Sequence, residues 1–157
     1  MLLTEVLRED LVKVGLEAKD KWEAIEELID LLISVHELSL MDRNDVVDAV
    51  FERERSLSTG LEHGVAIPHA VTGCVDELVG ALGTLDGIEF ESVDGQDTKL
   101  IILLLIPQGG FQRHVKTLAG IAKLGSAPLL RQQIFDAQTP AQIMETLRQS
   151  DIIQGKG

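Results

Sequence analysis

The sequence predicts an α/β protein, a three-layer α/β/α sandwich around a mixed sheet of roughly five strands. Helical periodicity dominates the N-terminal part of the chain, short apolar and glycine-containing segments occupy the middle, and helical periodicity returns towards the end. This order of elements is typical of a sheet covered by helices on both faces. Because neither an internal repeat nor a linker interrupts the pattern, residues 1–157 are expected to form one domain.

The first elements are a strand and two helices. Leu11–Leu16 is mostly apolar and is predicted to be a strand. Asp20 with Glu23 three residues later forms an acidic variant of the capping box, which begins a helix. Its apolar residues recur at three- and four-residue spacing: Trp22, Ile25, Leu28, Ile29, Leu32 and Val35. Asp42 is expected to cap a second helix, which ends near Arg55.

The middle of the chain is read as strands. The predicted strands are Val65–Ile67, Leu78–Leu85, residues 88–93 and Lys99–Ile106. Turn signals, Asp86–Gly87 and Asp94–Gly95, flank the third of them. The continuous apolar run of the fourth predicts a strand that is buried on both faces.

Three helices are predicted after a glycine-containing loop. In the first, one apolar face combines Val115, Leu118, Ala119 and Ala122. Pro128 opens a second, short helix, and Thr139–Pro140 opens the last one, Ala141–Gln149.

Composition narrows the classes of function. The formal net charge of −12 disfavours binding to nucleic acid or to anionic membranes, and it favours basic partner surfaces. The single Cys74 excludes an internal disulfide and a cysteine-based zinc cluster. The longest apolar run is far too short to span a membrane, and the N-terminus carries acid where a signal peptide needs base. We therefore expect a cytoplasmic protein without a cofactor.

Residues 58–69, S-T-G-L-E-H-G-V-A-I-P-H, hold two of the four histidines. Pro68 cannot donate a ladder hydrogen bond, so strand pairing is expected to end where His69 begins. His69 is either a nucleophile presented at the edge of the sheet or a loop histidine after a strand-ending proline. His63 either lines the same pocket or is a polar turn residue.

The other two histidines lie near helix ends. His36 follows the first helix, where the helix dipole favours a histidine without any further role. His114 is expected at or just before a helix N-terminus, where the dipole lowers the pKa of the ring and favours its neutral form. Alone it would be a cap or a surface residue, but it gains interest beside His69.

An anion site is the functional interpretation of the residues around His69. Arg53 and Arg55 in F-E-R-E-R form either a solvated charged face or a clamp for phosphate oxygens. Ser58 and Thr59 offer hydroxyls, and Gly60 with Gly64 would let backbone N–H groups approach an anion. These groups suit a transient phosphohistidine, because phosphoryl transfer depends mainly on positioning and charge stabilisation.

Rival chemistries have weaker support. The sequence lacks a phosphate-binding loop of the nucleotide hydrolases and a nucleophile elbow of the serine hydrolases. A zinc site built from His63, His69 and His114 would have Glu62 as its only adjacent carboxylate, and the spacing matches no standard zinc pattern. We therefore expect no metal.

The run R-E-R-S-L-S-T-G-L-E-H-G-V-A-I-P-H-A, residues 53–70, resembles the signature of the phosphotransferase-system enzyme IIA domains of the fructose/mannitol and nitrogen-regulatory type. Residues 94–107 are similar to the family's central strand, and residues 114–124 resemble the helix that follows its second active-site histidine. The resemblance covers nearly the whole chain. It implies an α/β/α sandwich with a phosphorylation cycle.

By this resemblance His69 would be the phosphoryl acceptor and His114 would hydrogen-bond the phosphoryl group or the imidazole. Arg53 would neutralise charge, and Thr59 would help to orient the site. Glu62 replaces a glycine that is common in the family, and its carboxylate would repel a phosphohistidine unless it points to solvent.

The resemblance also implies partners. The donor would be the histidine-containing phosphocarrier protein, charged by enzyme I from phosphoenolpyruvate. The recipient would be a cysteine of a IIB domain in sugar transport, or a regulatory partner would read the phosphorylation state. We favour the nitrogen-regulatory type over a sugar transporter component; a non-phosphorylated binding module of the same fold is a further alternative.

Overall fold

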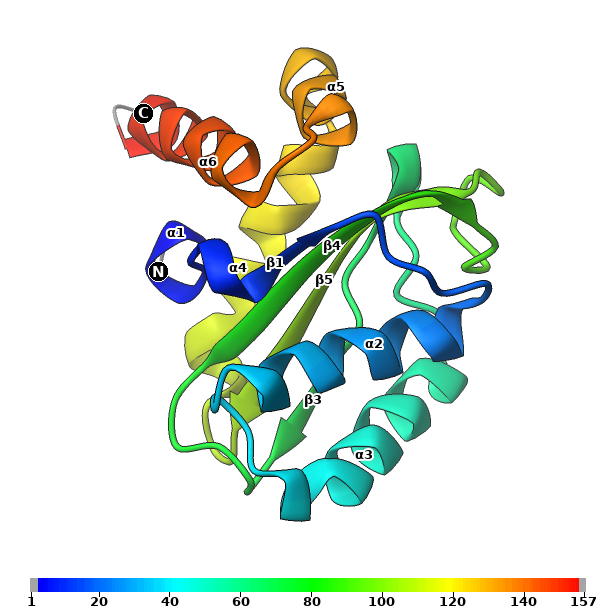
Figure 1. The fold of residues 1–157 in the computed structure, drawn as a ribbon, viewed down its shortest axis with the longest axis vertical. Helices are drawn as coiled ribbons and strands as arrows, with labels where there is room; N and C mark the ends of the chain where they lie inside the picture. Colours follow the sequence, from blue (N-terminus) through cyan, green and yellow to red (C-terminus); the bar gives the residue numbers. More distant parts are fainter. Residues whose placement is uncertain (1–2, 156–157) are drawn as a thin grey trace.

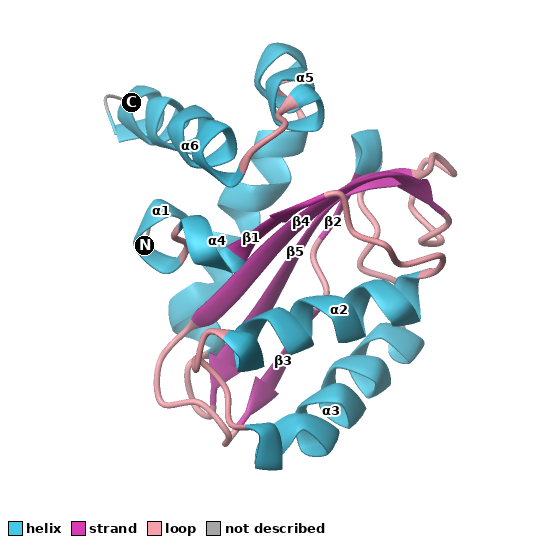
Figure 2. Cartoon of the chain, in the orientation of Figure 1, coloured by secondary structure: helices cyan, strands magenta, loops and turns pink. Residues whose placement is uncertain are grey.

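The computed structural model describes the backbone of residues 3–155 and the side chains of residues 3–150. A five-stranded mixed sheet lies between two layers of helices, which confirms the predicted fold class (Figures 1 and 2). The strand order is β1-β4-β5-β2, and β3 also pairs with β5. The strands are β1 (Val12–Val14), β2 (Val65–Ala66), β3 (His69–Thr72), β4 (Val79–Ile88) and β5 (Thr98–Pro107).

The centre of the sheet is the antiparallel pair β4 and β5, in which Leu82 lies opposite Ile102. β1 runs parallel to β4, and β2 and β3 run parallel to β5. Every residue of β5 from Leu100 to Ile106 is completely buried. Burial on both faces, predicted from the continuous apolar run, is thus confirmed.

The predicted turn at Asp86–Gly87 and the predicted strand at residues 88–93 are wrong. β4 continues through Asp86–Gly87 to Ile88, with a register shift between Thr84 and Ile88. Gly87 has a φ of 140°, so the glycine accommodates a bulge within the strand instead of a turn. Residues 89–93 form a loop whose one fully buried side chain is Phe90. The alternating pattern therefore reflects a single buried ring and not strand pairing.

One face of the sheet is covered by α2 (Lys21–Ser34) and α3 (Arg43–Ser56), which lie side by side in Figure 1. Asp20 caps α2 as predicted, because its Oδ1 accepts the N–H of Glu23 at 2.9 Å. Asp42 precedes α3 but makes no capping bond. A 3₁₀ turn, η2 (Leu40–Asp42), gives Asp42 a helical backbone conformation, whereas a capping residue needs an extended one.

The other layer consists of α4 (Phe111–Gly125), α5 (Pro128–Asp136), α6 (Pro140–Gly155) and the short α1 (Leu3–Val6) (Figure 1). The predicted apolar face of α4 is wrong, since Val115 is 41% exposed. The buried stripe instead comprises His114, Thr117, Ile121 and Leu124. It contains two polar residues, so a pattern of apolar residues alone missed it.

The predicted starts of α5 and α6 are confirmed. Pro128 occupies the first turn of α5, and the hydroxyl of Thr139 accepts the N–H of Gln142 at the start of α6. α6 extends to Gly155, beyond its predicted end at Gln149. Within residues 3–155, none of the helices has the length and apolar character that crossing a membrane requires.

Candidate functional site

His69 is the first residue of β3, on the edge of the sheet. β2 and β3 pair with β5 in one register, with Val65 opposite Leu100 and His69 opposite Leu104. They form a single edge strand that is interrupted for two residues. The expectation that Pro68 ends the strand is wrong: its carbonyl accepts the N–H of Leu104 at 3.1 Å, and pairing resumes at His69. An edge position tolerates the missing proline N–H, because that side faces no further strand.

The ring of His69 is half-buried and held by the backbone. Its Nδ1 lies 2.8 Å from the carbonyl oxygen of Ile67. A carbonyl only accepts hydrogen bonds, so Nδ1 carries the hydrogen and Nε2 keeps the lone pair. Burial lowers the pKa of His69 below its ordinary value. The ring is therefore neutral at physiological pH, with Nε2 as its nucleophilic nitrogen.

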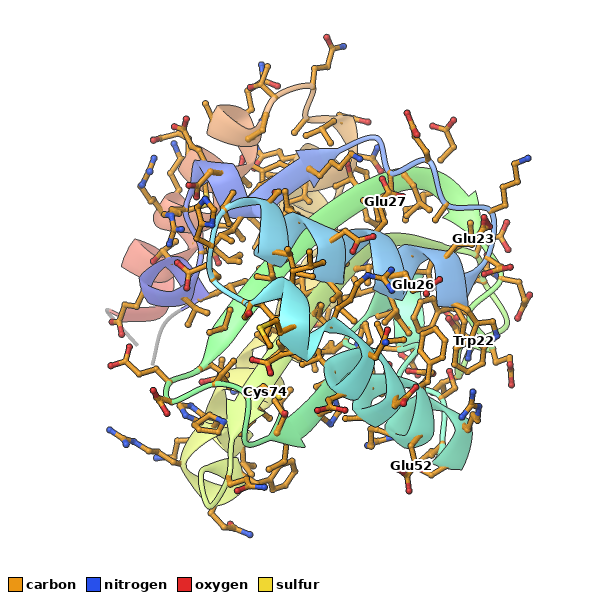
Figure 3. All side chains as sticks on the ribbon, turned by 60° about the horizontal axis from the view of Figure 1, so that its bottom comes forward. Trp22, Glu23, Glu26, Glu27, Glu52 and Cys74 are labelled. Atoms are coloured by element: carbon orange, nitrogen blue, oxygen red, sulfur yellow. The ribbon has the colours of Figure 1, made fainter. Side chains whose placement is uncertain are left out.

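His69 lines a cavity of about 380 Å³ between α3, β3 and the start of α4. The residues lining it are Ala49, Glu52, Arg53, Ser56, His69, Ala70, Val71 and Phe111. The structure therefore brings His69 and Arg53 to one cavity. Glu52 of α3, labelled in Figure 3, is an acidic residue of this lining. Sequence analysis did not assign Glu52 or Phe111 to the site.

Arg53 lies in the last turn of α3 and donates from Nη1 to the carbonyl of Leu57 at 2.8 Å. That carbonyl follows the helix, so the guanidinium also satisfies a group at the helix end. The positive charge of Arg53 reaches His69 and contributes, after burial, to the lowered pKa of that ring. The guanidinium has further donors in its fixed fork that can meet an anion in the cavity.

Thr59 is buried, and its hydroxyl does not serve as an open ligand. Its Oγ1 donates to Glu54 Oε1 at 2.5 Å, and its N–H donates to Glu54 Oε2 at 2.9 Å. Glu54 in turn pairs with Lys21 of α2 at 3.1 Å. The segment F-E-R-E-R was interpreted through its two arginines, and neither Glu54 nor Lys21 was predicted to be buried. The available signal was spacing, since Glu54 continues the buried stripe of Val47 and Val50.

Two backbone amides of the glycine-containing loop are already hydrogen-bonded within it. The N–H of Gly60 donates to Ser58 Oγ at 3.1 Å, and the N–H of Leu61 donates to the carbonyl of Val65 at 2.7 Å. Gly60 is needed for close packing instead: a Cβ there would lie 2.6 Å from Ser92 Oγ and 2.9 Å from Ser92 Cα. The amides of Gly60 and Leu61 are thus engaged within the loop, so the expected approach of an anion to Gly60 is not open.

His114 is buried at 4% exposure, in the fourth residue of α4 and not at its start. Its Nδ1 has no hydrogen-bond partner among the described residues. Burial, followed by the charge of Arg113, lowers the pKa of His114. No hydrogen bond joins His114 to His69 in the part of the chain that the structure describes, but Phe111, at the start of the same helix, lines the His69 cavity.

His63 and Glu62 lie in the turn η3 (Glu62–Gly64) and do not line the cavity. The side chains are 45% and 63% exposed and approach each other to 3.7 Å. His63 has a φ of 67°, and its N–H donates to Asp94. These positions agree with the turn interpretation of His63 and with the expectation that Glu62 points to solvent. Within residues 3–150, no group of three or more His, Cys, Asp and Glu side chains could hold a metal ion.

Known proteins resemble this chain over most of its length. A fructose-specific EIIABC component of the phosphotransferase system from Bacillus subtilis is 32% identical over 152 residues, 96% of this chain. The chain spans only 24% of that larger relative. A nitrogen regulatory protein from Bradyrhizobium diazoefficiens is 34% identical over 125 residues, which cover 79% of this chain and 80% of the relative.

A solved structure and a family model point to the same group of proteins as these relatives. The crystal structure of nitrogen regulatory protein IIA-Ntr from Neisseria meningitidis superposes with a TM-score of 0.84 at 29% identity, covering 92% of this chain and 98% of that one. Residues 5–150 match the family described as "Phosphoenolpyruvate-dependent sugar phosphotransferase system, EIIA 2". The chain therefore belongs to the type 2 enzyme IIA family of the phosphoenolpyruvate-dependent phosphotransferase system.

Proposed function

We propose that the protein is a phosphocarrier that accepts a phosphoryl group on Nε2 of His69 from the histidine-containing phosphocarrier protein. The observation that carries the proposal is the hydrogen bond from Nδ1 to the carbonyl of Ile67 at 2.8 Å, with the ring at a cavity that Arg53 shares. One nitrogen is occupied by the backbone, so the other is the nucleophile. Membership of the type 2 enzyme IIA family supports a role in phosphoryl transfer in general.

The transfer needs no acid or base beyond the two rings. The Nε2 lone pair of His69 forms a bond to phosphorus as the phosphorus–nitrogen bond of the donor phosphohistidine breaks. The electron pair of that bond returns to the donor ring. His69 keeps its Nδ1 hydrogen, and its ring gains positive character, which strengthens the hydrogen bond to the carbonyl of Ile67. The reverse sequence passes the group to the recipient.

The surroundings of His69 support proposed roles for Arg53, Glu52 and His114. Arg53 balances the charge of the transferred group, because phosphoryl transfer depends on positioning and electrostatic stabilisation. Glu52, at the same cavity, opposes a permanently bound phosphate and favours transient occupation. The unpaired Nδ1 of His114 is proposed to meet the phosphoryl group or a partner side chain when the charged state forms.

Two roles are open to the phosphorylated protein. We favour a nitrogen-regulatory role, in which partners read the phosphorylation state, because the IIA-Ntr structure superposes over 98% of its length. The alternative is donation to a cysteine of a IIB domain in fructose or mannitol transport. Its support is the 32% identity over 152 residues to the fructose-specific component. A binding module without phosphorylation is the third possibility.

The test is incubation of the protein with phosphoenolpyruvate, enzyme I and the histidine-containing phosphocarrier protein, followed by intact mass measurement. Wild type should gain one acid-labile phosphoryl group, and His69→Ala should gain none. His63→Asn is the matched control, since His63 is exposed and asparagine tolerates its positive φ. It should load like wild type. Equal loading of His69→Ala would refute the proposal, and a wild type that never loads would leave the binding module as the function.

The phosphorylated protein is then used to distinguish the transport role from the regulatory role. Rapid loss of phosphate to the cysteine of a fructose- or mannitol-type IIB domain would establish the transport role. Retention of phosphate in the presence of such IIB domains would support the regulatory role. A IIB domain whose cysteine is replaced by serine controls for hydrolysis during the incubation.

A further inference from the structure

A buried ion pair joins the two helices that cover one face of the sheet. Lys21, the first residue of α2, and Glu54, in the last turns of α3, are 5% and 1% exposed in their side chains and lie 3.1 Å apart. Lys and Glu are rarely buried unless they are paired. The Nζ of Lys21 also lies 5.0 Å from the ring centroid of Phe90 and 3.4 Å from Glu91. Trp22, labelled in Figure 3, packs edge to face on Phe51 of α3 beside this pair.

Both oxygens of the Glu54 carboxylate accept hydrogen bonds. Oε2 accepts from Lys21 Nζ and from the N–H of Thr59, and Oε1 accepts from the Thr59 hydroxyl. Hydrogen bonds to an ionised carboxylate are stronger than those between neutral groups. Thr59 is therefore fixed to α3 through both its backbone and its side chain, directly after the chain leaves the helix.

The connection continues to His69 through two backbone hydrogen bonds. The carbonyl of Thr59 accepts the N–H of Ile67 at 3.1 Å. The carbonyl of Ile67 then accepts Nδ1–H of His69 at 2.8 Å. Glu54 and Lys21 are thus linked to the ring of His69 through Thr59 and Ile67, although neither lines the cavity.

We propose that Lys21 and Glu54 are positioning residues for His69: they hold Thr59, and through it the Ile67 carbonyl, so that the ring keeps its hydrogen on Nδ1 and presents Nε2. The inference rests on the proposed function of His69 as phosphoryl acceptor. We call the set Lys21, Glu54, Thr59 and Ile67 the positioning chain.

Two observations favour positioning over stability alone. A buried ion pair recovers little more than its desolvation cost, so apolar residues of similar volume could bridge α2 and α3 equally well. The negative charge of Glu54 also acts on His69 and raises the pKa of the ring, opposing burial and Arg53, which lower it. Glu52, on the same helix, lines the cavity as well.

The first experiment measures the ring itself by NMR of its two nitrogens in the unphosphorylated protein. In Glu54→Gln we expect a smaller fraction of His69 with hydrogen on Nδ1 and a lower pKa, because a nearby negative charge is removed. The initial rate of phosphoryl loading should fall about tenfold, as expected for a misplaced nucleophile. Asp30→Asn is the matched control, since Asp30 pairs with Arg43 and joins the same two helices in an exposed position. It should change neither the tautomer nor the loading rate.

Thr59 provides a second pair of variants that preserves the Lys21–Glu54 pair. Thr59→Val removes the hydroxyl, and Thr59→Ser keeps it. We expect the valine variant to shift the His69 tautomer in the direction of Glu54→Gln and the serine variant to restore the wild-type ratio. If Glu54→Gln does not fold, the two Thr59 variants test the positioning role on their own.

A purely structural role predicts a different result. Folded Glu54→Gln and Thr59→Val would then melt at lower temperature but keep the wild-type tautomer, pKa and loading rate, and this outcome overturns the proposal. The tautomer is read without any phosphoryl donor. If wild type fails to load, the proposed function fails, while the NMR measurement still decides whether the positioning chain sets the state of His69.

Discussion

His69 is half-buried and His114 is buried, and the two regions that hold them differ in how they bond the histidine ring. On the edge strand, Nδ1 of His69 is bonded to the Ile67 carbonyl, so the ring is committed to one tautomer. On α4, Nδ1 of His114 is buried without a partner among the described residues. A ring with a fixed tautomer suits a nucleophile, whereas an unpaired one can adapt its hydrogen to a ligand that comes and goes.

The segment before His69 is also closely packed. The loop before His69 is fastened by Glu54 and by close contacts at Gly60, so it has little room to adjust. On α4, a Cβ at Gly120 would meet no atom within 4 Å, whereas one at Gly125 would lie 3.1 Å from Val65 Cγ2. The edge-strand region therefore provides a fixed support for the ring of His69.

The largest effect is expected at Arg53, which shares the cavity with His69. Arg53→Ala should reduce the rate of phosphoryl loading about 10²-fold, the usual cost of removing one charge-stabilising donor. Arg53→Lys should recover part of the rate, because it restores the charge without the fork. Quenched-flow loading followed by mass measurement gives both numbers at a pH of about 8, where His69 is neutral.

Arg55 is the matched control for this prediction. It is exposed, and its guanidinium stacks near the rings of Trp22 and Phe51 at 5.8 and 5.7 Å instead of facing the cavity. Arg55→Ala should load at the wild-type rate. A similar loss in both variants would mean that the general charge of α3, and not the position of Arg53, supports transfer.

Replacing Gly60 or Gly120 with alanine should change the free energy of unfolding in opposite directions. Gly60→Ala should lower the free energy of unfolding by about 1–3 kcal/mol, because its Cβ meets Ser92 backbone at 2.9 Å. Gly120→Ala should raise it by up to about 1 kcal/mol, since alanine favours a helix and the space is open. Urea unfolding of both variants checks the prediction. Equal destabilisation would contradict the difference in space around the two glycines.

Sequence periodicity predicted much of the fold because most elements bury apolar residues at regular spacing. The seven-residue apolar run of β5 and the stripe of α2 are examples. Periodicity failed where polar residues are buried, and where a glycine that signals a turn lies within a strand. The buried stripe of α4 includes His114 and Thr117, which no apolar pattern contains. Gly87 accommodates a bulge inside β4 although the same dipeptide is a common turn signal.

The candidate site shows the same limit. His69 and Arg53 were predicted, and the structure places them at one cavity. Lys21 and Glu54 were missed, since charged residues are ordinarily assigned to the surface. Both fall on the buried stripes of their helices, so spacing contained the signal. Their pairing depends on how α2 crosses α3, which is a tertiary relation that local patterns do not encode.

The smallest effect is a crossed pair of pKa changes that separates the two histidines. Burial is the main cause of the lowered pKa of both rings, and Arg53 lowers that of His69 further while Arg113 lowers that of His114. Removing either positive charge makes the protonated ring less unfavourable. Arg53→Gln should therefore raise the pKa of His69 alone, and Arg113→Gln should raise that of His114 alone.

The raised pKa of His69 in Arg53→Gln also predicts how the pH dependence of phosphoryl loading changes. Only neutral His69 has the Nε2 lone pair, so a raised pKa means that Arg53→Gln loses loading at a higher pH than wild type as the solution is acidified. Arg113→Gln should keep the wild-type pH profile. NMR titration of the two rings, assigned with His69→Ala and His114→Ala, measures both shifts. If one arginine moved both rings, His69 and His114 would share a single electrostatic environment, and the division into a fixed nucleophile and an adaptable partner would not hold.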